Sequence, residues 1–455
     1  MDLGEGLPPG ARRRAMATIA IAVSMAVLDS AIANIALPTI ARDMATTPAA
    51  TVWVVNAYQF AVTISILPFA FLGDIHGYKK VYMVGLVVFS LASLGCALAP
   101  TLPLLVVARV VQGFGGAGIM SVNTALIRFI FPRAELGRGL GFNAFVVATF
   151  SALGPSIAAG ILAVATWHWL FLINVPLGGV ALWLAGKVLP MTPKASHRFD
   201  LPSALLNALT FGLVITAVDG LGHHPGWREV IELAAALAVG AVFIARQLSL
   251  PAPLLPVDLF RRPIFALSVG TSVCSYIAQT SVYVCLPFYF QYVGGLTPIE
   301  TGLLMTPWPA IVVIVAPIAG RLSDRYPAGV LGTAGLAVMT AGLVCLLLMP
   351  AGASYANVAW RMVMCGFGFG FFQSPNNRLL VGSAPRERSG AGSGMLATAR
   401  LTGQTIGSAL VALAFGVTGA EAGVEVAHGT TLALTMAIVS ATTAMVVSSL
   451  RLRAR

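Results

Sequence analysis

The sequence predicts an all-α integral membrane protein with fourteen transmembrane helices. Of its 455 residues, 58% are hydrophobic and only 9% are charged, whereas soluble domains contain about 25% charged residues. Apolar runs long enough to cross a bilayer, about 20 residues, recur along the whole chain. The basic residues are concentrated in alternate connections between these runs. Together these observations exclude an ordinary soluble enzyme or binding domain.

Each apolar run is bounded by charged residues, Pro, Gly or His. The predicted spans lie near residues 16–38, 51–72, 80–99, 103–126, 139–164, 168–189, 202–221, 229–249, 264–290, 299–320, 329–350, 356–375, 390–416 and 429–450. The first run follows three arginines, as a signal peptide would, but it is longer than a usual signal sequence and contains Asp29. We therefore expect an uncleaved first helix.

The distribution of basic residues predicts the orientation. If the N-terminus is inside, the cytoplasmic segments hold 22 of the 27 Lys and Arg residues, and the outside holds only Arg42 and Arg228. Cytoplasmic loops of membrane proteins are enriched in Lys and Arg. The remaining three, Arg109, Arg361 and Arg400, lie within spans. We expect both termini in the cytoplasm, and we interpret the net charge of +11 as a sign of orientation rather than of nucleic-acid binding.

Two polar breaks, at 190–200 and 249–263, separate two central spans from the rest. The predicted organisation is a cytoplasmic segment 1–15, a six-helix bundle 16–189, a linker 190–263 with two additional transmembrane helices, a six-helix bundle 264–450 and a cytoplasmic tail 451–455. The two bundles echo each other, because "RVVQGFGGAG" in the fourth span resembles "RMVMCGFGFG" in the fourth span of the later bundle. Internal repeats of this kind are typical of transporters, whose substrate site lies near the midplane between the repeats.

Asp29 is the only acidic residue deep in the first bundle. An ionised side chain at the bilayer centre costs roughly 2.5–3.5 kcal/mol on insertion scales, so it is a functional candidate. Arg109 is the obvious partner, and a carboxylate held between desolvation and a guanidinium can load and release a proton. We predict that Asp29 and Arg109 couple transport to protons; the alternative is a structural ion pair.

The stretch "VARVVQGFGGAG" contains the spacing Gly113-x-Gly115-x-x-Gly118, which elsewhere cradles a dinucleotide pyrophosphate. That motif needs a surrounding βαβ unit, and the flanks here are transmembrane helices. We instead expect Gly113 and Gly116 to let a neighbouring helix approach closely. No cofactor is expected, and the proton gradient is the expected energy source.

Polar stripes on several spans predict a central substrate cavity. Aromatic residues on the same faces could hold lipophilic cations. The alternative for each residue is interhelical hydrogen bonding or ordinary core packing. The candidates are Asn34, Asn56, Tyr58, Gln59, Gln112, Phe145, Tyr276, Gln279, Tyr283, Trp308, Arg400 and Gln404.

Charged residues at the cytoplasmic ends predict a latch between helices that breaks during transport. Its candidate members are Asp74, Lys79, Lys80, Asp324 and Arg325, with solvated loop ion pairs as the alternative. Three acids near outer span ends are either rim charges or a second proton or cation site; these are Asp219, Glu232 and Glu300. No metal-ligand cluster or pairing of nucleophile and base is apparent, so we expect neither a metal site nor an enzyme.

Several motifs, in order along the chain, resemble the major facilitator superfamily, and in particular its fourteen-span drug:proton antiporters. They are "LDSAIANIALPTIARDM" at 28–44, "WVVNAYQFAVTISILPFAFLGD" at 53–74, "RVVQGFGGAG", "LGPSIAAGIL" at 153–162, "WHWLFLINVPLG" at 167–178 and "GAGSGMLATARLTGQTIGSAL" at 390–410. The resemblance implies that the fifth helix bends at Gly154 and Pro155, as it does at the Gly-Pro pair of the antiporter motif. Ile75 and Tyr78 stand where basic residues are usual, which points to a weaker cytoplasmic latch.

The resemblance implies a proton-driven exporter of lipophilic, often cationic, toxic compounds that works by alternating access. It also implies a location in the bacterial inner membrane and a functional monomer, with small-molecule substrate, H⁺ and the lipid bilayer as partners. The sequence does not say whether periplasmic or outer-membrane adaptor proteins are also partners. An exporter or H⁺ symporter of a specific metabolite on the same fold is the alternative.

Overall fold

The computed structural model describes residues 6–132, 135–194, 199–223, 226–250, 253–350, 352–383, 389–420 and 423–452, and this part of the chain is helical with no strand. Within it, eleven helical segments are long and apolar enough to cross a membrane. The three other predicted spans coincide with helices α10 (Trp227–Ser249), α15 (Tyr355–Ser383) and α16 (Ser389–Val417). A helix therefore lies at each of the fourteen predicted positions.

The first half of the chain supplies six of these positions. Its helices are α1 (Pro9–Asp43), α2 (Pro48–Thr51), α3 (Trp53–His76), α4 (Tyr78–Ala97), α5 (Leu102–Ile130), α6 (Leu136–Val164), α7 (His168–Leu172) and α8 (Asn174–Val188). Thr47 caps α2 by accepting from the backbone N–H of Ala50. Gly77, at φ 92°, separates α3 from α4 in a conformation that favours glycine.

The second half repeats the pattern after two additional helices. They are α9 (Leu201–His223) and α10, followed by η2 (Val257–Arg261), α11 (Pro263–Phe288), η3 (Tyr289–Val293), α12 (Pro298–Met305), α13 (Pro307–Leu322), α14 (Ala328–Leu347), α15, α16 and α17 (Gly423–Leu450). The segment η3 continues α11 as a π-helix. Thr297 and Glu300 form a capping box at the start of α12.

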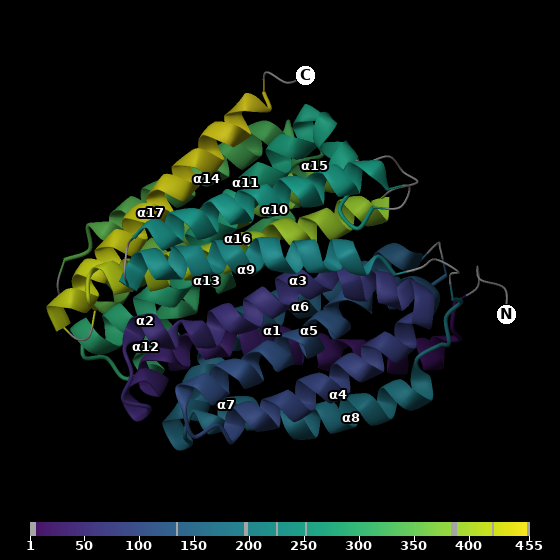
Figure 1. Ribbon diagram of the computed structural model, residues 1–455, viewed down its shortest axis with the longest axis horizontal. Coiled ribbons are helices and arrows are strands. Elements are labelled where there is room, and N and C mark those ends of the chain that lie inside the picture. Colours follow the sequence, from purple (N-terminus) through teal and green to yellow (C-terminus); the bar gives the residue numbers. More distant parts are fainter. Residues whose placement is uncertain are drawn as a thin grey trace.

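The two halves lie beside each other, with α9 between α3 and α16 in the view of Figure 1. The halves meet where α1 contacts α11 and α12, where α6 contacts α12 and α13, and where α3 contacts α16. Helix α9 packs against α10 and also against α3 and α16, one helix from each half. An ion pair from Arg246 Nη2 to Asp200 Oδ1, 2.8 Å long, joins one end of the α9–α10 pair. The additional helices therefore sit against the junction of the halves.

The glycines of α5 pack against two neighbours. A Cβ on Gly113 would lie 2.6 Å from the carbonyl oxygen of Tyr58 in α3, and one on Gly115 would lie 2.4 Å from the backbone nitrogen of Phe89 in α4. A Cβ on Gly116 would meet the Tyr58 hydroxyl at 2.7 Å, and Gly118 lies against Gly85. Such close approach requires residues without side chains, so α5 is wedged between α3 and α4.

Replacing Gly113 with alanine is expected to lower the melting temperature of the detergent-solubilised protein. The new methyl group has to displace the backbone of α3, and overpacking costs about 1–3 kcal/mol. Gly160 in α6 is the matched control, because nothing lies within 4 Å of a Cβ there. Gly160→Ala should leave the melting temperature unchanged or raise it, since alanine favours a helix by up to about 1 kcal/mol. Equal melting temperatures for the two variants would contradict the packing role of Gly113.

Candidate functional site

A buried ion pair joins Asp29 in α1 to Arg109 in α5. Arg109 Nη1 lies 2.5 Å from Asp29 Oδ2, and the two residues are 0% and 2% exposed respectively. The other carboxylate oxygen, Oδ1, accepts from Gln112 Nε2 at 2.7 Å and from Asn174 Nδ2 at 3.1 Å. Three donors from α5 and α8 therefore surround one carboxylate. Of these three, the sequence predicted only Arg109 as a partner of Asp29.

The guanidinium of Arg109 is held on several sides. Its Nε donates to the carbonyl of Val54 at 2.9 Å, and its Nη1 also donates to Gln112 Oε1 at 2.5 Å. The rings of Tyr58 and Phe171 lie 4.4 and 5.4 Å from its central carbon, within cation–π range. Its Nη2 is buried without a hydrogen-bond partner in the described part of the chain.

Helix α4 completes this network with residues that the sequence did not single out. Gln112 Nε2 donates to Ser93 Oγ at 2.8 Å, and Cys96 Sγ lies 3.5 Å from Gln112 Oε1. Asn174, at the start of α8, was missed as well. It lies within the stretch "WHWLFLINVPLG". An amide side chain in an otherwise apolar span was the sequence feature that could have identified it as a member of the network.

In the conformation observed, both oxygens of the Asp29 carboxylate have hydrogen-bond donors, and one of these donors is charged. Each donor stabilises negative charge on the carboxylate, and a buried charge without such partners would be costly. A proton that reaches Asp29 would weaken its attraction for Arg109. The guanidinium, whose Nη2 has no hydrogen-bond partner in the described part of the chain, could then move. The pair can thus link protonation to a rearrangement of α1 against α5.

Arg400 in α16 lies near two of the predicted cavity residues, one from each half. Arg400 interacts electrostatically with Tyr58 of the first half and with Tyr276 of the second half. Close by in sequence, Thr405 of α16 shares a 3.0 Å hydrogen bond with Thr63 of α3. Side chains from both halves therefore meet along the α3–α16 contact. Gln404 in α16 and Gln279 in α11 are both half-buried.

Many of the predicted cavity residues have a buried polar atom with no hydrogen-bond partner among the described residues. Buried polar groups are normally paired, so each exception calls for an explanation. The atoms are Asn34 Oδ1, Asn56 Oδ1, Tyr58 Oη, Gln59 Oε1, Trp308 Nε1 and Arg400 Nε. Unpaired polar atoms of this kind are what a polar site between two bundles would offer to a substrate, although other described residues, such as Tyr82 and Asn357, also have them.

The aromatic candidates of the second half form two contacts. Tyr276 packs edge-on against Phe369 at 5.4 Å between ring centroids, and its hydroxyl accepts from Gln373 Nε2 at 2.7 Å. Tyr283 packs against Trp308, also at 5.4 Å. Phe145 is instead 61% exposed. It lies about three turns before Ser156 on α6, and so on the face that contacts the second half.

Among the described residues, the hydrogen bonds between the bundles lie near mid-helix or at the outer end. The outer end is defined here as the end with few basic residues. Arg42 Nη2 donates to Gln291 Oε1 at 2.7 Å, and Gln291 Nε2 donates to the carbonyl of Ile35 at 3.2 Å. Ser156 and Thr306 share a 2.8 Å bond. The sequence did not single out this outer contact.

The predicted bend of α6 lies at a crossing of three helices. A Cβ on Gly154 would lie 2.5 Å from the Cβ of Ala31 in α1. The carbonyl of the next residue, Pro155, lies equally close to the Cβ position of Gly302 in α12. The Gly-Pro step therefore brings α1, α6 and α12 together.

At the helix ends with many basic residues, the described contacts of the predicted latch stay within each half. Asp74 accepts from the hydroxyl of Tyr78, and Asp324 pairs with Arg378, while Arg325 is exposed. Lys79 Nζ donates to the carbonyls of Gly186 and Leu189, at 2.8 Å each, and so joins α4 to α8. Lys80 is exposed. A latch between the halves stays a prediction.

Two of the three acids near outer span ends have local partners. Glu232 pairs with Arg228 at 3.1 Å, and Glu300 accepts from the Tyr355 hydroxyl at 2.5 Å besides its capping contacts. The side chain of Asp219 lies outside the described residues.

Comparison with known proteins identifies the family. The sequence profile of the Major Facilitator Superfamily matches residues 19–408. The chain is also 56% identical over 453 residues to the uncharacterized transporter YebQ of Escherichia coli (strain K12), which covers 98% of this chain and 97% of YebQ. The chain belongs to the Major Facilitator Superfamily.

Other relatives have names that point to different substrates. The riboflavin transporter RibZ of Clostridioides difficile (strain 630) is 33% identical over 86% of this chain and 85% of RibZ. The multidrug resistance protein Stp of Mycobacterium tuberculosis (strain CDC 1551 / Oshkosh) is also 33% identical, over 85% of this chain and 73% of Stp. Among solved structures, a bacterial homolog of the human lysosomal transporter Spinster, inward-facing and unoccupied, aligns with a TM-score of 0.69 at 15% identity over 99% of both chains. The major facilitator fold predicted from the sequence is confirmed, and the chain is a multi-pass membrane transporter.

Proposed function

We propose that this transporter is a proton-driven exporter of lipophilic, mainly cationic compounds, located in the bacterial inner membrane with both termini in the cytoplasm. The observation that carries the proposal is the buried Asp29 carboxylate, held by Arg109, Gln112 and Asn174 beside the junction of the two halves. A titratable group within a membrane span is the natural entry point for a driving proton.

Export of toxic compounds is supported by the kinship with Stp, named as a multidrug resistance protein. The aromatic residues along the α3–α16 and α11 contacts would suit a lipophilic cation. An exporter or H⁺ symporter of a specific metabolite is the second candidate, because RibZ, named as a riboflavin transporter, is equally similar.

The test uses energised inside-out membrane vesicles that contain the wild-type protein, with candidate compounds from a resistance screen in a pump-deficient host. Antiport predicts that adding a substrate outside such vesicles dissipates the acidic interior, because protons leave as substrate enters. We expect Asp29→Asn to abolish this response at an unchanged protein level in the membrane. The pH change is followed with a fluorescent amine.

Asp43→Asn is the matched control, because it makes the same chemical change on the same helix. Asp43 is exposed and accepts only from Trp167 Nε1 in the described contacts. If the Asp29→Asn variant carries out proton-coupled efflux at the same rate as the Asp43→Asn variant, Asp29 is not the proton site. Proton movement in the same direction as substrate would instead favour the symporter.

A further inference from the structure

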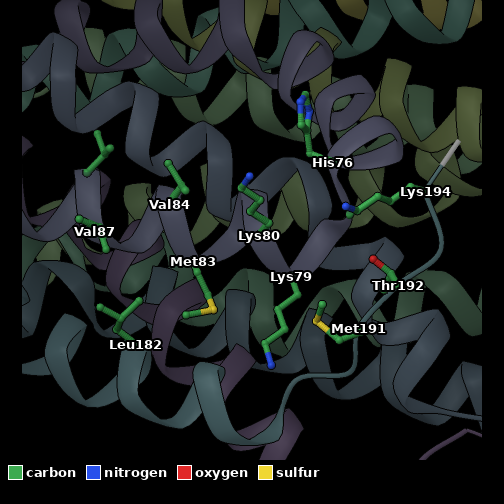
Figure 2. A pocket seen from close by; sticks show the side chains of 12 residues that line it. His76, Lys79, Lys80, Met83, Val84, Val87, Leu182, Met191, Thr192 and Lys194 are labelled. Atoms are coloured by element: carbon green, nitrogen blue, oxygen red, sulfur yellow. The ribbon is translucent and has the colours of Figure 1, made fainter. Parts of the chain in front are cut away.

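A hollow on the first half lies away from the junction of the bundles. It has a volume of about 570 Å³ and is formed by α4, the end of α3, α8 and the segment that follows α8. The residues that line it are His76, Gly77, Lys79, Lys80, Met83, Val84, Val87, Val88, Leu182, Met191, Thr192 and Lys194 (Figure 2). None of the central polar residues described above belongs to it.

One end of the hollow is basic. Lys80 and Lys194 are exposed, His76 lies at the same end, and Figure 2 shows their side chains around one open region. Lys79 points away from them in Figure 2, toward the α8 carbonyls that it binds. No carboxylate is among the lining residues. In the part of the chain that the structure describes, neither Lys80 nor Lys194 forms an ion pair, so this end presents positive charge.

The other end of the hollow is apolar. Lys80, Met83, Val84 and Val87 follow the i, i+3, i+4, i+7 spacing and so form one face of α4. Between Lys80 and Val87 this face extends roughly 10 Å along the helix. Val84 is 54% exposed although it lies in a membrane-spanning helix, so this face borders the acyl chains of the bilayer.

The wall formed by residues 191–194 is fixed to the start of α4. The backbone N–H of Tyr78 donates to Thr192 Oγ1 at 2.8 Å, and Gly77 packs against the same hydroxyl. Lys79 fastens the end of α8 on the other side. The hollow is thus a formed pocket with polar anchors, rather than a gap beside a loose connection.

We propose that this hollow binds an anionic glycerophospholipid of the leaflet that faces the basic loops. The phosphate would lie between Lys80 and Lys194, and one acyl chain would follow Met83, Val84 and Val87 beside Leu182. Basic pockets between helices at the cytoplasmic face are suited to anionic headgroups. The apolar wall distinguishes a lipid from a free phosphate, which would use only the basic end.

The test is native mass spectrometry of the purified full-length protein with added dioleoyl phosphatidylglycerol or dioleoyl phosphatidylcholine. Wild type should retain phosphatidylglycerol preferentially. The double variant Lys80→Gln, Lys194→Gln should retain less, by about fivefold for each lysine removed. Val84→Trp, which fills the apolar wall and keeps the charges, should also reduce retention of phosphatidylglycerol.

Lys187→Gln is the matched control, because Lys187 lies on α8 outside the hollow, over the ring of Trp183. It should retain phosphatidylglycerol as wild type does. Equal retention by wild type and the double lysine variant would overturn the proposal, as would equal retention of the two lipids by wild type. Displacement of phosphatidylglycerol by inorganic phosphate, with no effect of Val84→Trp, would identify a free-phosphate site and would overturn it as well.

Discussion

Replacing Arg109 with glutamine is expected to abolish transport and to lower the free energy of unfolding by about 3–5 kcal/mol, the usual cost of removing one partner from a buried ion pair. Asp29 would keep the amide donors of Gln112 and Asn174 but would lose its only countercharge in the described structure. The measurements are substrate-dependent proton flux in vesicles and thermal unfolding in detergent.

A double-mutant cycle separates the structural from the coupling contribution of the pair. Asp29→Asn in the Arg109→Gln background removes the unpaired charge, so it should restore stability but not transport. Arg361→Gln is the control, because Arg361 is another buried arginine, in α15, without an ion pair among the described residues. Losses of stability that simply add in the double variant would show that Asp29 and Arg109 do not act as a unit.

The sequence predicted the fold because span length and charge placement depend only on composition along the chain. It also predicted the pair Asp29 and Arg109, since a lone acid and a lone base in one apolar bundle have few other partners. It did not predict Asn174 or Ser93 as members of the network. Their contribution depends on how α4 and α8 are rotated about their axes, which composition does not determine.

Two further differences have local physical causes. Close approach of a neighbouring helix was predicted at Gly113 and Gly116, whereas α5 has neighbours on two sides, so Gly115 is as crowded as Gly113 and Gly118 lies against Gly85. Gln291, which bridges the halves at their outer end, lies in the π-helical segment η3. A π-helix changes the direction of the side chains that follow it, and no regular period reveals such a turn from sequence.

The second large effect is expected at the outer contact between the halves. A Cβ on Gly302 of α12 would lie 2.5 Å from the carbonyl oxygen of Pro155 and 2.7 Å from the Cβ of Ala159, both in α6. Leucine at this position cannot fit while the two bundles touch. The proposed alternating-access mechanism implies that this contact opens in the opposite conformation, so Gly302→Leu should destabilise only the outer-closed state.

An overpacking cost of about 1–3 kcal/mol corresponds to a shift of roughly fivefold to more than a hundredfold toward the outer-open state. Spin labels at Leu98 and Leu348, which are exposed at the outer ends of α4 and α14, report this shift as a longer distance in pulsed electron paramagnetic resonance. The labels are introduced after the five native cysteines have been replaced.

Gly160→Leu is the control on α6 itself, because a Cβ at Gly160 meets nothing within 4 Å. It should leave both the distance distribution and transport unchanged. Gly302→Leu should slow transport in proportion to the loss of the outer-closed state. An unchanged distance in a normally folded Gly302→Leu protein would mean that the α6–α12 contact does not separate during transport. In that case the hydrogen bond of Ser156 with Thr306 beside it would belong to a fixed joint, and Arg42 with Gln291 would be the part of the outer contact that has to open.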